Sequence, residues 1–316
     1  MPKTSIVTFF FNLKALSDST METRSLDFYL EKGKPTLAIK APMFIFCDQT
    51  TRPLLEDLRN SLAKDVPTVY IEKSISEYEH YNLLWETLEK SYGNKNKRVT
   101  RSYFLTMTFK LVALLISSQR DDFATPYFCW LDLGCSHVAP DNFQTAINKI
   151  LLEPSERISA CSIHYRGETE LEDSAEYCVN GKCGLAGTLL TSDKEHIIKL
   201  YPRYMRILFE HIEKGIWYSD EQVLTYCYYR HPEIFNIYYG DYSSVLLNYH
   251  IIKADWESID RFLIKEAIKN GDVENGKHIA MKVKDSLDRG ELVEKPEVSE
   301  YINYIITGSV CFNNNI

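Results

Sequence analysis

The sequence predicts an α/β fold in which a mostly parallel sheet is flanked by helices on both faces. Short apolar runs typical of strands alternate with helical patterns through the first half of the chain. Three of these runs are followed by a polar residue, namely Asn12, Asp48 and Asp132. From Ile251 onward the segments become charged and helical. We therefore expect a main domain over residues 1–250 and a helical C-terminal appendage over residues 251–316.

The predicted strands are rich in β-branched and aromatic residues, whereas the predicted helices carry apolar residues three and four positions apart. Strands are predicted over residues 6–11, 43–47, 68–71, 127–131, 157–164 and 234–239. A hairpin is predicted over residues 176–179 and 182–190, around the turn Asn180-Gly181. Helices are predicted over residues 52–62, 76–90, 101–118, 141–152, 192–215 and 219–230. Ser192 and Glu195 have the spacing of a capping box at a helix start.

Composition limits the classes of function. The chain has 316 residues with 45% apolar and 25% charged content, enough for one large α/β domain with an appendage. Its net charge of −8 comes without a basic face, which argues against nucleic-acid binding. No run reaches the roughly 20 apolar residues that span a bilayer, and the N-terminus lacks the features of a signal peptide. We therefore expect a cytoplasmic protein, in the producing cell or its host.

The eight cysteines fit a reducing compartment. Four of them stand inside apolar runs, where a thiol behaves as a small hydrophobic group: Cys47, Cys129, Cys161 and Cys227. Cys178 and Cys183 flank the predicted hairpin turn. No further ligands stand near this pair with zinc-site spacing, so we expect two reduced thiols.

The strongest single feature is Asp132, which ends an apolar run and is followed two positions later by Gly134. In parallel sheets, ligands bind outside the carboxyl ends of the strands. A fixed carboxylate there can hold a divalent cation that neutralises a diphosphate, and Gly134 would let the backbone approach a ligand closely. An Asx-turn at the end of a strand explains the same aspartate without any function.

Other candidates also have a structural explanation beside the functional one. Asp220 and Glu221 follow Ser219, where acids suit the first turn of a helix, yet a carboxylate there can also act as a base. His250 is either a packed imidazole or a metal ligand. Lys110 either extends its stem along apolar neighbours to water or meets a phosphate, and Tyr103 lies at the start of the same predicted helix.

Several motifs then occur in order over residues 5–250: IVTFFFNL, PMFIFCDQTT, FCWLDLG, GLAGTLL, YSDEQVLTYCYYRHPEIF and YYGDYSSVLLNYH. With Tyr103 and Lys110 ahead of FCWLDLG, the chain resembles the HtrL/YibB-like family of bacteria and large viruses, which is related to GT-A glycosyltransferases. The resemblance implies a GT-A (Rossmann-like) fold, a nucleotide-sugar donor such as a UDP-sugar, and a divalent cation, Mn²⁺ or Mg²⁺. Residues after 250 lie outside it.

The resemblance also implies roles for individual residues. The family's aspartate corresponds to Asp132, but the usual Asp-x-Asp pattern has Gly134 at its second acidic position here. A late histidine completes the metal site in similar transferases, so Asp132 and His250 are the predicted metal ligands. Asp220 and Glu221 are the predicted catalytic residues beside the acceptor. The predicted donor-binding residues are Phe10, Phe11, Asn12, Asp48, Tyr103, Lys110, Asp132, Gly134 and Gly187.

These observations predict a glycosyltransferase that moves a sugar, as in hexosyl transfer, from a UDP-sugar to a hydroxyl of a glycan or other acceptor. The alternative is a GT-A-fold module that binds a nucleotide or sugar with little or no catalysis. A nucleotidyltransferase is disfavoured, because Asn12-Leu13-Lys14 follows the first strand where such enzymes carry a glycine-rich loop. A homodimer paired through the charged C-terminal helices is a further alternative that the sequence leaves open.

Overall fold

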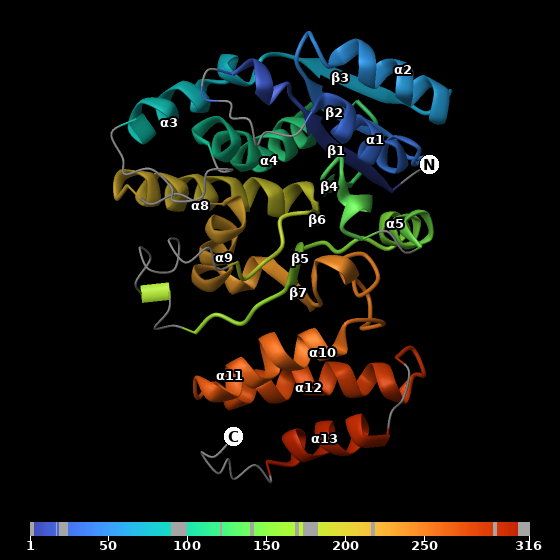
Figure 1. The fold of residues 1–316 in the computed structure, drawn as a ribbon, viewed down its shortest axis with the longest axis vertical. Helices are drawn as coiled ribbons and strands as arrows, with labels where there is room; N and C mark the ends of the chain where they lie inside the picture. Colours follow the sequence, from blue (N-terminus) through green and yellow to red (C-terminus); the bar gives the residue numbers. More distant parts are fainter. Residues whose placement is uncertain are drawn as a thin grey trace.

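One sheet organises the protein, with its strands in the order β3-β2-β1-β4-β6-β5-β7 (Figure 1). The computed structural model describes residues 3–16, 18, 25–89, 100–120, 122–139, 142–167, 171–172, 183–215, 219–292 and 296–308. The strands are β1 (Thr4–Phe10), β2 (Met43–Cys47), β3 (Thr68–Glu72), β4 (Tyr127–Leu131), β5 (Ile158–Ser162), β6 (Leu189–Asp193) and β7 (Phe235–Tyr239). Strand β6 is antiparallel to its neighbours β4 and β5, and the other pairs are parallel. The predicted mixed, mostly parallel sheet is confirmed.

Helices cover both faces of the sheet (Figure 1). One face packs against α1 (Leu26–Leu37), α2 (Arg52–Leu62) and α5 (Phe143–Leu152). The other face packs against α3 (Glu79–Glu89), α4 (Arg101–Arg120), α8 (Lys194–Glu213) and α9 (Asp220–Arg230). Successive strand residues therefore enter different cores, as Ile6 and Val7 do. Both are fully buried, which explains why the strands read as continuous apolar runs.

Short helical turns connect these elements. They are the 3₁₀ helices η1 (Leu13–Ala15), η2 (Ile75–Glu77), η3 (Cys135–His137), η4 (Pro232–Ile234) and η5 (Tyr242–Ser244). Four of them follow the carboxyl end of a strand: η1 comes after β1, η2 after β3, η3 after β4 and η5 after β7. They therefore lie at the edge of the sheet where a ligand is expected.

The C-terminal part is helical, as predicted. It comprises α10 (Trp256–Ile259), the π-helical segment η6 (Asp260–Ile264), α11 (Lys265–Lys269), α12 (Val273–Asp288) and α13 (Pro296–Thr307). These helices share a core of their own around Ile264, Ile279 and Ile302. The Tyr165 backbone N–H joins this part to the sheet by donating to Phe262 O at 2.8 Å.

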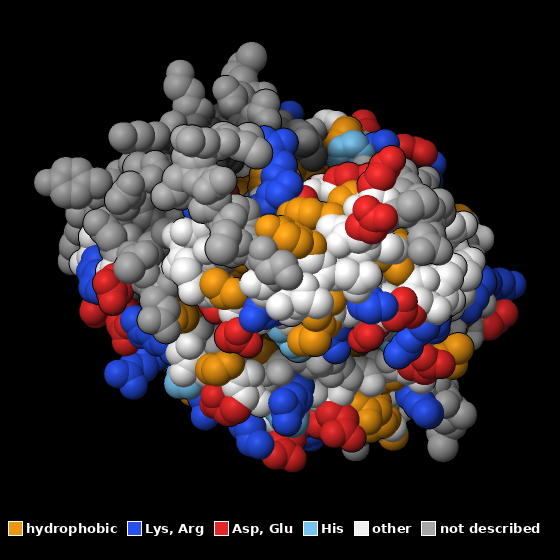
Figure 2. All heavy atoms as spheres, turned by 90° about the horizontal axis from the view of Figure 1, so that it is seen from below, with side chains coloured by type: hydrophobic (Ala, Val, Ile, Leu, Met, Phe, Trp, Pro, Cys, Tyr) orange, Lys and Arg blue, Asp and Glu red, His pale blue; other side chains and the backbone are white. Residues whose placement is uncertain are grey.

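The surface seen from the C-terminal end carries acidic and basic side chains interspersed with one another (Figure 2). Among the described residues, no helix is both long enough and apolar enough to cross a membrane. The described cysteines are free thiols, and Cys47, Cys129, Cys161 and Cys227 are buried as predicted. Cys178 lies outside the described residues.

Three details of the structure differ from the sequence predictions. Helix α1 was not predicted, because Gly33 and Pro35 interrupt its pattern. Ser192 does not cap a helix: β6 continues to Asp193, whose side chain accepts a hydrogen bond from His196 N. Of the predicted hairpin, residues 176–182 lie outside the described part, and only Leu189 and Leu190 of the second half belong to a strand.

Arg59 on α2 binds backbone carbonyls between the end of α1 and the start of β2. Its side chain is almost fully buried. The guanidinium donates to Leu37 O and Ile39 O, both at 2.6 Å, and to Ala41 O at 2.8 Å. These carbonyls belong to the end of α1 and the segment that leads into β2, so one side chain satisfies backbone groups that the helix end leaves without partners.

We predict that Arg59→Met lowers the free energy of unfolding by about 3 kcal/mol, because buried carbonyls lose their donors while the volume is nearly kept. Urea denaturation measures the change. Arg206→Met is the matched control, since the Arg206 side chain is 81% exposed. Equal midpoints for the two variants would contradict the role given to Arg59.

Candidate active site

The carboxyl ends of β1, β2 and β4 meet at one edge of the sheet. Asn12, Asp48 and Asp132 each follow one of these strands, and the structure brings them to this edge. Asn12 N donates to Asp48 Oδ2 at 2.6 Å, and both Asn12 and Asp132 line one cavity. The edge is therefore the ligand-binding edge expected for parallel strands.

The cavity has a volume of about 290 Å³, close to the lower limit of about 300 Å³ for small-molecule sites. Aromatic rings form much of its wall. The Phe9 ring lies 5.4 Å from that of Phe11 and 5.0 Å from that of Trp130, measured between centroids. Asp132 is the acidic side chain among the described lining residues. The cavity thus offers apolar walls with one carboxylate, a combination suited to a ring-bearing polar ligand.

Asp132 is held through one of its two oxygens. Trp130 Nε1 donates to Oδ1 at 2.9 Å, and Lys110 Nζ lies 3.2 Å from the same atom. Trp130 and Asp132 are two residues apart, so their side chains leave the extended chain on the same side. The Asp132 side chain is 33% exposed, which leaves Oδ2 available to a ligand. Burial raises the pKa of Asp132, and Lys110 opposes that rise.

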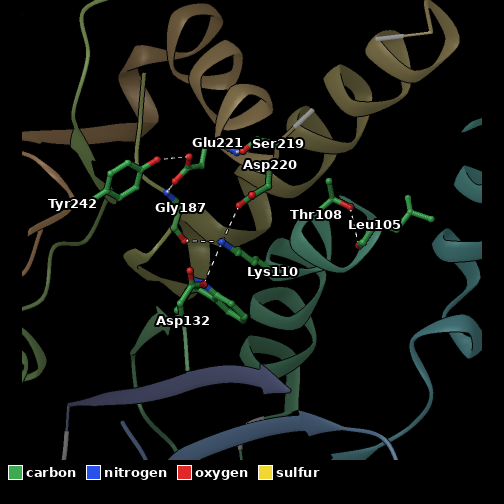
Figure 3. A network of polar contacts seen from close by, with 10 residues as sticks. Leu105, Thr108, Lys110, Asp132, Gly187, Ser219, Asp220, Glu221 and Tyr242 are labelled. Atoms are coloured by element: carbon green, nitrogen blue, oxygen red, sulfur yellow. Dashed lines mark hydrogen bonds and ion pairs between the residues drawn. The ribbon is translucent and has the colours of Figure 1, made fainter. Parts of the chain in front are cut away.

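Lys110 lies at the centre of a polar network (Figure 3). Its Nζ is 3.2 Å from Asp132 Oδ1, 3.0 Å from Asp220 Oδ2 and 3.1 Å from Gly187 O. An ammonium has three N–H donors, so these acceptors use all of them. The side chain is buried and does not extend to water. Burial lowers the pKa of Lys110, but Asp132 and then Asp220 raise it by more, so the group stays charged.

Glu221 holds the other side of Gly187. Its Oε1 accepts from Gly187 N at 2.9 Å, and its Oε2 accepts from Tyr242 OH at 2.6 Å (Figure 3). Burial and then Asp220 raise the pKa of Glu221, while its two hydrogen bonds lower it. Ser219 caps α9 by accepting a hydrogen bond from Glu221 N at 3.1 Å. Side chains therefore bind both backbone groups of Gly187.

Most of the predicted site residues belong to one of two sets, and two residues belong to neither. The residues that line the cavity are Phe10, Phe11, Asn12, Tyr103, Asp132 and Gly134. The network behind it contains Lys110, Gly187, Asp220 and Glu221. Asp48 is the first exception: it accepts from Thr50 N and Thr51 N at 2.9 Å as well as from Asn12 N, so it orders the loops without lining the cavity.

His250 is the second exception, because the structure does not bring it to Asp132. It is an exposed residue that lies against the backbone of Lys149 near the end of α5, with its ring 4.7 Å from that of Tyr249. The end of α5 leads into the start of β5, at the amino edge of the sheet, whereas Asp132 is at the carboxyl edge.

The residues around Asp132 provide few protein ligands for a divalent metal ion. The ammonium of Lys110 stands 3.2 Å from Oδ1 and occupies the place of a cation between Asp132 and Asp220. Within the described ranges, no group of three or more His, Cys, Asp or Glu side chains is arranged to hold a metal. The predicted ligand pair of Asp132 and His250 therefore finds no support in this arrangement.

Sequence reasoning missed several contributors. Tyr242 binds Glu221 from a distant turn, and nothing in the spacing of the two residues indicates it. Lys32 lines the cavity from α1, the helix that was not predicted. Trp130 offered a signal, since an indole two positions before a strand-ending aspartate lies on the same side of the strand. Thr188 receives a hydrogen bond from Asp132 N at 3.0 Å and extends the pairing of β4 and β6.

Comparison with known proteins places this site in a family. Residues 2–251 match the family described as "Bacterial protein of unknown function (HtrL_YibB)". The chain belongs to the HtrL_YibB family. The match includes the cavity and the Lys110 network and ends just before the C-terminal helices. No curated protein matches this HtrL_YibB chain.

Solved structures with a similar fold include enzymes of more than one class. Mouse xyloside xylosyltransferase 1, in its apo form, is 12% identical with a TM-score of 0.43, over 73% of this chain and 83% of that one. The 4-diphosphocytidyl-2C-methyl-D-erythritol synthase from Anaerococcus prevotii is 12% identical with a TM-score of 0.37, over 82% and 93%. CMP:2-keto-3-deoxy-manno-octonic acid synthetase, complexed with CTP, is 8% identical with a TM-score of 0.37, over 76% and 90%. Similarity at this level defines no activity for the HtrL_YibB chain.

A substitution at Gly187 tests the packing of the network around Lys110. A Cβ there would lie 2.6 Å from Asp220 Oδ2 and 3.2 Å from Lys110 Nζ. We predict that Gly187→Ala lowers the free energy of unfolding by about 1–3 kcal/mol, because the added methyl group separates the ion pair.

Gly134→Ala is the matched control at the same edge of the sheet, since its nearest contact would be Lys32 Cβ at 4.0 Å. Chemical denaturation of both variants gives the comparison. If Gly187→Ala is no less stable than Gly134→Ala, the network is looser than described.

Proposed function

We propose that the protein is a glycosyltransferase that moves a sugar from a nucleotide-diphosphate donor, a UDP-sugar, to a hydroxyl of a glycan or other acceptor. The observation that carries this proposal is the aromatic cavity at the carboxyl ends of β1 and β4, with Asp132 as its carboxylate. A nucleoside requires flat apolar walls, and a sugar hydroxyl requires a fixed acceptor oxygen. Both are found at one edge of the sheet.

In this proposal the nucleoside binds between the end of β1 and the start of α4. Phe10, Phe11 and Asn12 contribute one wall, and Tyr103 contributes the other. Asp48 holds Asn12 in place by accepting a hydrogen bond from the Asn12 backbone N–H. The backbone at Gly134 has open space beside it, because a Cβ there would have one neighbour, 4.0 Å away. The diphosphate therefore has room to pass this segment.

The reaction forms a bond between the acceptor oxygen and the anomeric carbon of the sugar. The bond from that carbon to the β-phosphate oxygen breaks, and its electron pair leaves with the nucleoside diphosphate. The proton of the acceptor hydroxyl passes to a carboxylate. We assign it to Asp132 Oδ2, the free oxygen of a side chain that is one-third exposed and whose pKa is raised by burial.

Asp220 and Glu221, the predicted catalytic residues, serve as positioning groups in this scheme. Asp220 is buried, and its Oδ2 pairs with Lys110 Nζ. The two carboxylate oxygens of Glu221 accept hydrogen bonds from Gly187 N and from Tyr242 OH. Their direct participation stays a prediction. Assistance by Mn²⁺ or Mg²⁺ also stays a prediction, and no step is assigned to a metal here.

We predict that Asp132→Asn reduces the release of UDP from a UDP-sugar by about 10²-fold or more, because the amide cannot take the proton. UDP release is measured over a panel of UDP-sugars with and without acceptor glycans. Asp122→Asn is the matched control, since Asp122 pairs with Arg120 outside the cavity. Both variants need unfolding midpoints close to that of the unmodified protein.

The outcomes separate the two functions that the sequence left open. Full activity in Asp132→Asn would show that the reaction centre lies elsewhere. Binding of UDP without release from any donor would favour a nucleotide- or sugar-binding module. Failure to bind any nucleoside diphosphate would remove the basis of both.

A further inference from the structure

Among the described residues that line the cavity around Asp132, basic side chains outnumber acidic ones. Half-buried Lys32 from α1 and exposed Lys14 from η1 both line it, and His137 from η3 stands beside them. Asp132 is the acidic lining residue in the described ranges, and one of its oxygens is already bound by Lys110. A cleft with an excess of one charge concentrates ligands of the opposite charge. This wall suits an anion better than a metal cation.

Lys32 lies beside the position where a second acid is missing. A Cβ on Gly134 would be 4.0 Å from Lys32 Cβ, so the stem of Lys32 adjoins the place where a side chain at position 134 would begin. An acid at this position would bring positive charge to a diphosphate only indirectly, by holding a cation. A lysine brings its positive charge directly.

Packing between α1 and the segment after β4 fixes Lys32 in this place. Ser136 Oγ donates to Lys32 O at 3.0 Å. Gly33 lies so close to Leu133 that a Cβ would stand 2.7 Å from Leu133 Cγ. The Lys32 ammonium stands 6.0 Å from the ring centroid of Phe28, another residue of the cavity wall. The backbone of Lys32 is thus held while its side chain reaches along the cavity.

Lys110 cannot supply the same charge without breaking the network. Its three N–H donors are used by Asp132, Asp220 and Gly187. A phosphate would have to displace one of these acceptors, and each displaced carboxylate would be left buried without its cation. In the described part of the lining, the positive charge available to a diphosphate is therefore that of Lys32, with Lys14 nearer the solvent.

We propose that Lys32 binds the diphosphate of the donor and that its ammonium takes the place of a divalent cation, so that donor binding needs no metal. This inference rests on the proposed function, since it names the group that receives the donor's phosphates. Lys32 acts on the phosphates and Lys110 acts on Asp132. The two lysines thus have separate tasks.

The test is calorimetric binding of UDP and of uridine in EDTA and in Mn²⁺. We expect UDP to bind in EDTA, and Lys32→Gln to weaken it about tenfold or more, the loss of one charge-assisted contact. Uridine, which lacks phosphates, should bind both proteins alike. Lys32→Arg keeps the charge and should keep most of the affinity. Lys34→Gln is the control on the same helix, since Lys34 pairs with Glu31 away from the cavity.

Two results would overturn the inference while the proposed function stands. The first is UDP binding that occurs with Mn²⁺ and not in EDTA. The second is UDP binding in EDTA that Lys32→Gln leaves unchanged. Absence of UDP binding in both conditions would overturn the inference and the proposed function together. Circular dichroism of each variant distinguishes lost binding from lost folding.

Discussion

A single buried ammonium holds together segments that are far apart in the chain. Lys110 on α4 joins the end of β4 at Asp132, the segment before β6 at Gly187, and the start of α9 at Asp220. Burying a charge is costly unless its partners are close and well aligned. Loss of Lys110 would leave the buried carboxylate of Asp220 without its cation. The edge of the sheet therefore has one strongly preferred arrangement, and the cavity takes its shape from it.

The network around Lys110 contains more carboxylates than cations. Asp132, Asp220 and Glu221 surround one lysine, and burial raises the pKa values of Asp132 and Glu221. Neutral donors stabilise these carboxylates, because Trp130 donates to Asp132 while Tyr242 and Gly187 N donate to Glu221. Hydrogen bonds of this kind stabilise a carboxylate without adding charge.

Much of the fold could be predicted from the sequence, because its local signals agree with the final structure. The strands β2 and β4 were predicted with their observed bounds. Helix α1 was missed, since Gly33 lowers helix propensity, and only its close contact with Leu133 explains the glycine. Asp132, Lys110 and Asp220 were identified as separate candidates. The sequence did not indicate that the Lys110 ammonium binds both Asp132 and Asp220, which lie 22 and 110 positions further along the chain. These residues meet because of the order of the strands in the sheet.

The C-terminal helices show what an independent core permits. Ile264, Ile279 and Ile302 are buried among one another rather than in either core beside the sheet. Residues beyond 251 lie outside the family match. A hydrophobic core constrains the pattern and volume of its residues more than their identity. This part of the chain should therefore tolerate substitutions that keep its apolar pattern and volume, whereas the edge of the sheet depends on the exact placement of the partners of one buried charge.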